Sequence, residues 1–148
     1  MNTSDELLDQ VLDQAMDKIA AVLKNGQFKA VAALIEAFIQ IMFHVEDRFE
    51  PYASKFIPIL IEQIQSNDTN TQKVSIDAFN ALATTCKEHI IQFRVDILQA
   101  LKPIKSHKVK PVRDASLYTI KLLRELDPPL GDKELAILDE LPTTRRLT

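Results

Sequence analysis

Glycine, tryptophan and cysteine are scarce in this 148-residue sequence, which has two glycines, no tryptophan and one cysteine. Two isolated glycines exclude the glycine-rich loops that cradle phosphates in Walker and dinucleotide-binding motifs. A single cysteine, Cys86, excludes an internal disulfide and fits a reducing compartment. No apolar run reaches the length of a membrane span, and the acidic start MNTSDELLDQ lacks the apolar segment of a secretory signal. We therefore expect a cytoplasmic protein.

The residues that enzymes use for chemistry are present but are not grouped. His44, His89 and His107 do not have the spacing of metal ligands, and Cys86 is close only to His89. No serine or cysteine lies in the sharp turn that exposes a nucleophile. A net charge of −3 argues against a nucleic-acid partner. The sequence therefore predicts a protein that is not an enzyme and that has no cofactor and no metal.

Apolar residues recur at helical spacing along almost the whole chain. Helices are expected at residues 3–23, 28–43, 51–65, 70–85, 90–104, 111–126 and 132–141, followed by a flexible tail at 142–148. Gly26 suits the residue after a helix end, and Pro111 suits a first helical position. Residues 28–43 are apolar on most sides, which is typical of a helix buried between neighbours. The predicted fold class is all-α.

Two consecutive helices match their counterparts about forty residues later, which is the period of HEAT-type arrays. The matched pairs are Ile57 with Ile97, Ile61 with Leu101, Ile64 with Ile104, Ser66 with Ser106, Ser75 with Ser116, Ile76 with Leu117 and Phe79 with Ile120. Because the turn between the helices also matches, chance is the weaker explanation. The sequence predicts a HEAT-type helical-repeat solenoid of about seven helices.

Several stretches resemble a known family. KVKPVRDASLYTI resembles the start of the first helix of a HEAT repeat. IAAVLKNGQFKAVAALIEAFIQIM, FIPILIEQIQSNDTNTQKVSIDAFNALA and HKVKPVRDASLYTIKLLREL are similar to the later repeats of TOG-like domains, especially those of tortifolia/spiral-type plant microtubule-associated proteins. The resemblance covers most of residues 12–126. It implies a protein-binding domain that associates with tubulin or microtubules, in the cytoplasm and on the cytoskeleton.

The resemblance also assigns the repeat register. The first helix matches the second helix of a repeat, so residues 1–141 are expected to form one half repeat followed by about three helix pairs. The second, fourth and sixth helices would form one layer, and the third and fifth the other. Such a stack has apolar end faces, which a partner or a second copy could cover. The candidate end faces are Leu8, Leu12 and Ile19, or Leu135, Leu138 and Leu141.

The turns within repeats are the first candidate binding site. In TOG-like domains these turns form the edge that binds tubulin, with a tryptophan in an early repeat and basic residues in later ones. The matching turns here are residues 44–49, 86–90 and 127–131. They contain no tryptophan, and their candidate contacts are Arg48 and Lys87, each next to acidic residues.

The turn between the fifth and sixth helices is the second candidate, with five cations from Lys102 to Arg113 and no acid. Lys105, Lys108 and Lys110 precede a helix start and would form an anion site for an acidic peptide, a tubulin tail or a phosphate. The alternative is a solvated edge that contributes little to stability. Arg113 is expected to be structural, in an ion pair with Asp77 of the adjacent repeat.

Two functions remain open at this point. The chain is either a TOG-like domain for tubulin or microtubules, or a scaffold or adaptor that binds another protein and forms a homo-oligomer through its ends. The first helix, with five acids, is interpreted as a solvated acidic face. Contact between this face and the basic turn of another copy is a further alternative, because such heterologous contacts build rings or filaments.

Overall fold

The computed structural model describes residues 3–138 of the chain. Its elements are α1 (Thr3–Lys24), α2 (Val31–Val45), η1 (Glu46–Phe49), α3 (Glu50–Ile64), α4 (Thr69–Thr85), α5 (Lys87–Gln92), α6 (Arg94–Leu101), η2 (Lys102–Ser106), α7 (Lys110–Glu125) and α8 (Asp132–Ile137). No β-strand occurs between residues 3 and 138, so the predicted all-α class is confirmed. The expected tail and the last residues of the seventh expected helix lie outside the described residues.

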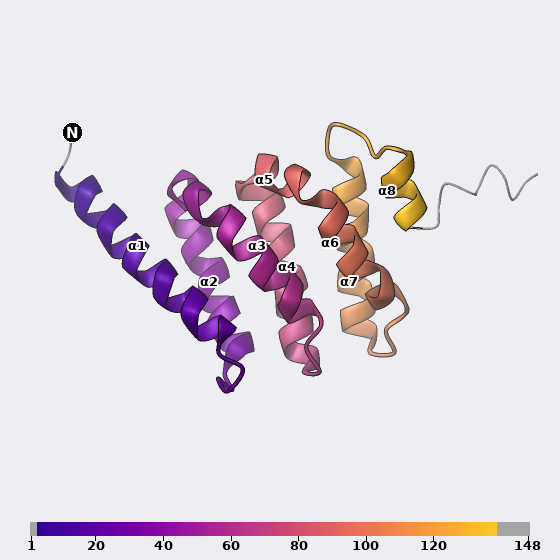
Figure 1. Cartoon of the computed structure of the whole chain (residues 1–148), viewed down its shortest axis with the longest axis horizontal. Coiled ribbons are helices and arrows are strands. Elements are labelled where there is room, and N and C mark those ends of the chain that lie inside the picture. The colour runs from indigo at the N-terminus through magenta and orange to yellow at the C-terminus, as the bar shows by residue number, and fades with distance from the viewer. Residues whose placement is uncertain (1–2, 139–148) are drawn as a thin grey trace, which may run out of the picture.

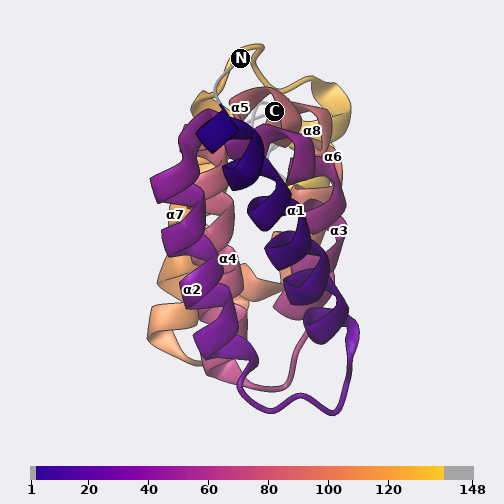
Figure 2. The same cartoon turned by 90° about the vertical axis from the view of Figure 1, so that its left-hand side faces the viewer.

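The helices form two layers that run along the molecule (Figure 1). In one layer α2 packs against α4 and α4 packs against α7. In the other, α1 packs against α3, α3 against α6, and α6 against α8. Figure 2, which looks along the stack from α1, shows the two layers side by side. This arrangement is the predicted helical-repeat solenoid.

The forty-residue period appears in the hydrogen bonds between neighbouring repeats. Thr119 donates to the side-chain oxygen of Asn80, 39 residues earlier, at 2.8 Å. Gln63 donates to the carbonyl of Leu23, 40 residues earlier, at 3.2 Å. Residues one period apart occupy equivalent places in adjacent repeats, so they lie next to each other.

The buried positions follow the predicted register. Phe79 and Ile120, matched across one repeat, are 0% and 4% exposed. Ser75 and Ser116 are both fully buried, and each hydroxyl donates to a main-chain carbonyl. The match fails for Leu117, which is 47% exposed although Ile76 is buried. Leu117 is exposed because α7 is the last helix of its layer within the described residues.

The predicted helix at residues 90–104 is wrong as a single element. The structure divides this stretch among α5, α6 and η2. Pro103 has no N–H to donate to the carbonyl four residues earlier, so the end of α6 tightens into a 3₁₀ turn. The break at Phe93 turns the next residue, Arg94, into the interior, where it is 3% exposed.

The apolar end faces expected for the stack are partly buried in the structure. At the α8 end Leu138 is buried, while Leu141 lies outside the described residues. At the α1 end Leu12 is buried and Ile19 is half-buried, but Leu8 is 42% exposed. Among the described candidates, Leu8 of α1 is the one that stays exposed.

Candidate protein-binding edges

The turns of the solenoid lie along two opposite edges (Figure 1). We define the intra-repeat edge as residues 46–50, 86–90 and 126–132, and the inter-repeat edge as residues 24–30, 65–68 and 102–110. The intra-repeat edge contains six acids and two cations, whereas the inter-repeat edge contains six lysines and one acid. The fold therefore separates charge between its two edges, although the chain as a whole is only weakly acidic.

Arg48, a candidate contact on the intra-repeat edge, is bound by α1. Its guanidinium lies 2.6 Å from the carboxylate of Asp9 and 3.0 Å from that of Asp5. The hydrogen bond to Asp9, together with the charges of Asp9 and Asp5, raises the pKa of Arg48 above its usual value. A partner would have to displace two aspartates of α1 to bind this side chain.

The contact between Arg48 and α1 is the first of a series, which we call the acid ladder. Asp5, Asp9, Asp13 and Asp17 follow each other at four-residue spacing and so share one face of α1. The Tyr52 hydroxyl donates to Asp13, and the Lys55 ammonium donates to Asp17 at 2.6 Å. The acidic face of α1 is exposed, as expected, but four of its five acids also bind side chains of η1 and α3.

Lys87, the other candidate on this edge, is exposed and has no ion pair within residues 3–138. Beside it, His89 shares a hydrogen bond of 3.2 Å with the Ser54 hydroxyl and lies 3.6 Å from the carboxylate of Glu50. Cys86 is 4% exposed, and burial raises the pKa of its thiol. The cysteine is thus a core residue that favours its neutral form.

The three lysines of the inter-repeat edge have different roles. Lys105 is half-buried, and its ammonium donates to the carbonyl of Leu138 at 3.2 Å. Lys110 is exposed and forms an ion pair of 2.7 Å with Asp114. Lys108 is exposed and has no ion pair in the described part of the chain. Of the three, Lys105 ties η2 to the end of α8, and Lys108 and Lys110 face solvent.

The turn that carries these lysines is held by His107. Its ring Nδ1 accepts a hydrogen bond of 3.0 Å from the backbone N–H of Val109. Its carbonyl accepts one of 3.1 Å from the guanidinium of Arg113. The expected ion pair of Arg113 with Asp77 is therefore wrong: Arg113 reaches back along its own chain, and Asp77 pairs with Lys73 one helical turn away at 2.8 Å. A structural role for Arg113 stays a prediction.

Arg94 is a buried charged residue that the sequence analysis missed. Its guanidinium lies 2.9 Å from the carboxylate of Glu134, which also accepts the N–H of Gly131 at 2.9 Å. The same guanidinium donates to the carbonyls of Leu123 and Leu126. Arg94 and Glu134 are 40 residues apart in the sequence. A pair of opposite charges separated by one repeat period was therefore the sequence signal that could have predicted this contact.

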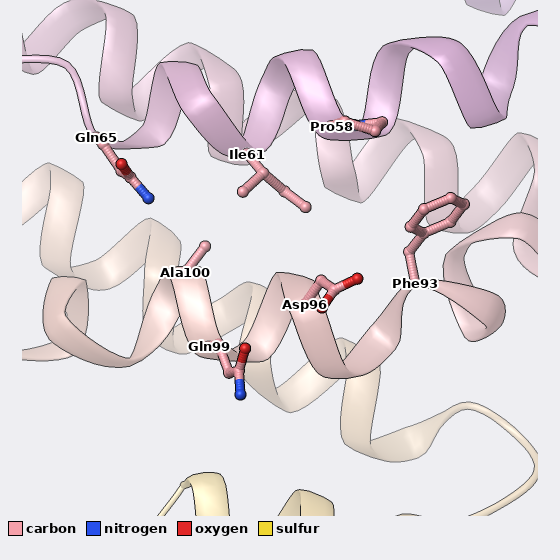
Figure 3. Close-up of a pocket in the computed structure, with 7 residues that line it drawn as sticks. All are labelled: Pro58, Ile61, Gln65, Phe93, Asp96, Gln99 and Ala100. Carbon is pink, nitrogen blue, oxygen red and sulfur yellow. The ribbon is translucent and has the colours of Figure 1, made fainter.

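A groove lies between α3 and α6. Its volume is about 350 Å³, and its lining residues are Pro58, Ile61, Gln65, Phe93, Asp96, Gln99 and Ala100 (Figure 3). Every buried side-chain polar atom within residues 3–138 has a hydrogen-bond partner, so no buried unsatisfied group lines this groove. The described residues also contain no group of three His, Cys, Asp or Glu side chains placed to hold a metal ion.

None of the described helices has both the length and the apolar character needed to cross a bilayer.

Comparison with known proteins assigns the chain to a family. A family model described as "TORTIFOLIA1 N-terminal" matches residues 1–125. The chain belongs to the TORTIFOLIA1 N-terminal family. TORTIFOLIA1-like protein 4 of Arabidopsis thaliana is a similar protein, 30% identical over 115 residues. The match covers 78% of this chain and 18% of that TORTIFOLIA1 relative, so the chain spans only a small part of its length.

Membership of the TORTIFOLIA1 family confirms the resemblance seen in the sequence to tortifolia-type proteins. The two-layer helical stack is consistent with a HEAT or TOG-like architecture for this TORTIFOLIA1 domain.

Proposed function

We propose that this chain is a protein-binding domain that associates with tubulin or microtubules and acts by binding, without catalysis. The observation that carries the proposal is the presentation of turns in two rows on a solenoid that belongs to the TORTIFOLIA1 family. The microtubule partner comes from the resemblance to tortifolia/spiral-type microtubule-associated proteins. With this partner, the proposed location is the cytoplasm, on the cytoskeleton.

The stack supports binding because it holds each row of turns in a defined geometry. The acid ladder joins α1 to α3, the Thr119–Asn80 hydrogen bond joins α7 to α4, and the Arg94–Glu134 pair joins α6 to α8. Side chains on a preorganised surface lose less conformational entropy when a partner binds. A row of such turns suits a partner that is itself large and repetitive.

Co-sedimentation with microtubules, together with size-exclusion chromatography with free tubulin, tests this function. We expect the chain to pellet with microtubules or to co-elute with tubulin, and to remain in the supernatant when microtubules are absent. If the chain neither pellets with microtubules nor co-elutes with tubulin at low salt, the proposed function is wrong.

A second candidate function is a scaffold that associates with a second copy of the chain through its α1 end. The observation that favours it is an apolar groove of about 340 Å³ between α1 and α2. Its lining residues are Ala15, Lys18, Ile19, Val22, Phe28 and Leu34. Along the same face of α1, Val11 is 55% exposed. Large exposed apolar surfaces of this kind are typical of protein interfaces.

Light scattering at increasing concentration tests the scaffold candidate. If the α1 end is an interface between copies, the mass should rise to that of a dimer, and Val11→Glu together with Phe28→Glu should restore the monomer. A monomer at every concentration would contradict self-association and would leave the tubulin proposal unaffected.

A further inference from the structure

We infer that the inter-repeat edge is the surface that binds an acidic, extended polypeptide segment, with Lys108 and Lys110 as central contacts. The inference rests on the proposed protein-binding function, and it adds the edge that makes contact and the chemistry of the partner. The resemblance to TOG-like domains implies the opposite, intra-repeat edge as the surface that binds tubulin.

The first argument is the charge of the inter-repeat edge. The one acid within residues 24–30, 65–68 and 102–110 is Asp68, which caps α4. Its carboxylate accepts hydrogen bonds from the hydroxyl and the backbone N–H of Thr71, at 2.7 and 3.0 Å. These bonds lower the pKa of Asp68. The lowered pKa keeps Asp68 ionised, but six lysines against this one carboxylate leave the edge strongly positive.

The second argument is the availability of the cations. Lys24, Lys29 and Lys108 are exposed and have no ion pair within residues 3–138. Lys110 is paired with Asp114, but the two side chains are 74% and 50% exposed. Exposed pairs of this kind contribute roughly 0–1 kcal/mol, so Lys110 can exchange Asp114 for another carboxylate at little cost. Arg48 on the opposite edge would have to leave two aspartates rather than one, Asp5 and Asp9.

The third argument is that the turn carrying Lys108 has a defined shape. His107 accepts hydrogen bonds from Val109 and Arg113 on one side of the lysine. On the other side, Lys105 holds η2 to the carbonyl of Leu138. The backbone around Lys108 is therefore ordered before a partner arrives, which lowers the entropy lost on binding.

The distribution of the lysines indicates an extended partner. Lys24 and Lys29 lie at the first inter-repeat turn, whereas Lys108 and Lys110 lie at the third. The first and second turns meet at a polar groove of about 230 Å³, whose lining includes Lys29, Ser66 and the capping residue Asp68. A single phosphate would reach only one of these turns. Carboxylates spaced along a chain can reach several, so a glutamate-rich segment fits this edge.

Fluorescence anisotropy with a labelled ten-residue polyglutamate peptide tests the inference on the full chain. Lys108→Glu with Lys110→Glu should weaken peptide binding by at least about tenfold, because each reversal replaces an attraction with a repulsion. The matched control is Lys87→Glu with Lys133→Glu, which reverses two exposed lysines at or next to the intra-repeat edge. This control should leave peptide affinity within about twofold. Binding should also weaken as salt rises, because exposed charges are screened. An unchanged circular dichroism melt shows that both variants fold.

The same variants in microtubule co-sedimentation separate this inference from the proposed function. Loss of both peptide and microtubule binding in the Lys108/Lys110 variant supports both proposals. If that variant pellets like the wild type while the Lys87/Lys133 variant does not, the inference is overturned and the tubulin function stands. If the wild type binds the peptide but neither tubulin nor microtubules, the function fails and the inference stands. No peptide binding by the wild type, or equal binding of an oligonucleotide of the same length, overturns the inference.

Discussion

Arg94 shows at the scale of one residue how the last repeat is held. The guanidinium is buried, pairs with Glu134 and donates to two carbonyls at the end of α7. Removing one partner of a buried pair leaves an uncompensated charge, which costs about 3–5 kcal/mol. Arg94→Ala should therefore lower the free energy of unfolding by about that amount in urea denaturation.

The control for Arg94→Ala is Lys73→Ala. Lys73 pairs with Asp77 at a similar distance, but both side chains are more than a third exposed. That change should cost less than about 1 kcal/mol, as exposed pairs do. Equal losses from the two substitutions would show that the Arg94–Glu134 pair is solvated and that α8 is held by apolar packing alone.

Tyr52 makes the stability that the acid ladder provides depend on pH. Burial raises the pKa of its phenol to about 12, with smaller contributions from the hydrogen bond to Asp13 and from the nearby aspartates. A folded-state pKa above the unfolded value of about 10 means that the folded protein binds this proton more tightly. The resulting stability is complete below pH 10 and is lost as the pH rises towards 12.

Chemical denaturation at pH 9 and at pH 11 tests this assignment. The free energy of unfolding should fall more between these values in the wild type than in Tyr52→Phe, which has no phenolic proton to lose. Tyr118→Phe serves as the control, because Tyr118 is 61% exposed on α7 and outside the ladder. Identical pH dependence in the wild type and in Tyr52→Phe would contradict a half-buried, hydrogen-bonded phenol.

At the scale of elements, α1 is attached by two kinds of contact. Leu12, Met16, Ala20 and Leu23 are buried against the core, while the acid ladder binds the neighbouring face to η1 and α3. Each exposed ion pair contributes roughly 0–1 kcal/mol, and the contribution decreases with salt. The apolar face should therefore keep α1 folded on the stack, while the ladder fixes its position.

Replacing Asp9, Asp13 and Asp17 by asparagine should accelerate hydrogen exchange in α1 without affecting α4. The free energy of unfolding should fall by about 1–2 kcal/mol in total. High salt should produce a similar acceleration in the wild type. The matched control replaces Glu88, Asp96 and Asp127, which are exposed and have no ion pair within residues 3–138. If α1 exchanges at the same rate in both triple variants, the ladder does not hold the helix.

At the scale of the whole molecule, the stack predicts a gradient of stability. α4 contacts α2, α3 and α7 and has ten buried residues, whereas α1 and α8 end the stack. In a solenoid each repeat is stabilised mainly by its neighbours, so elements with a neighbour on one side open more readily. Hydrogen exchange should be slowest in α4 and fastest in α1 and α8. Uniform exchange along the chain would mean that the molecule opens as a single cooperative unit.

Much of the fold could be predicted because its signals are local. The apolar spacing of residues 28–43 and the turn chemistry at Pro111 depend only on nearby residues. The repeat period placed Phe79 and Ile120 at equivalent buried positions, and the structure confirms this. The break at Phe93 could not be predicted, because no proline or glycine marks it and it depends on the interior contacts of Arg94.

The candidate site was less predictable, because charge pairing depends on geometry between repeats. Arg48 was expected to face a partner, yet the packing of α1 on α3 places Asp5 and Asp9 beside it. Arg113 was expected to bind Asp77, but the nearer acceptor is the carbonyl of His107. Long side chains on a helix can reach several neighbours, and small changes in helix position decide which neighbour is in reach.

The resemblance to TOG-like domains supplied the layers of the second to sixth helices, whereas the sequence pattern by itself determined the all-α class and the forty-residue period. These follow from hydrophobic spacing, which acts within a helix and repeats from one unit to the next. Only the tertiary structure decided which edge carries which charge, which cations are already paired and which remain exposed. The physical reason is that Coulomb and hydrogen-bond energies depend on distances of a few ångströms between residues far apart in the chain, which packing sets.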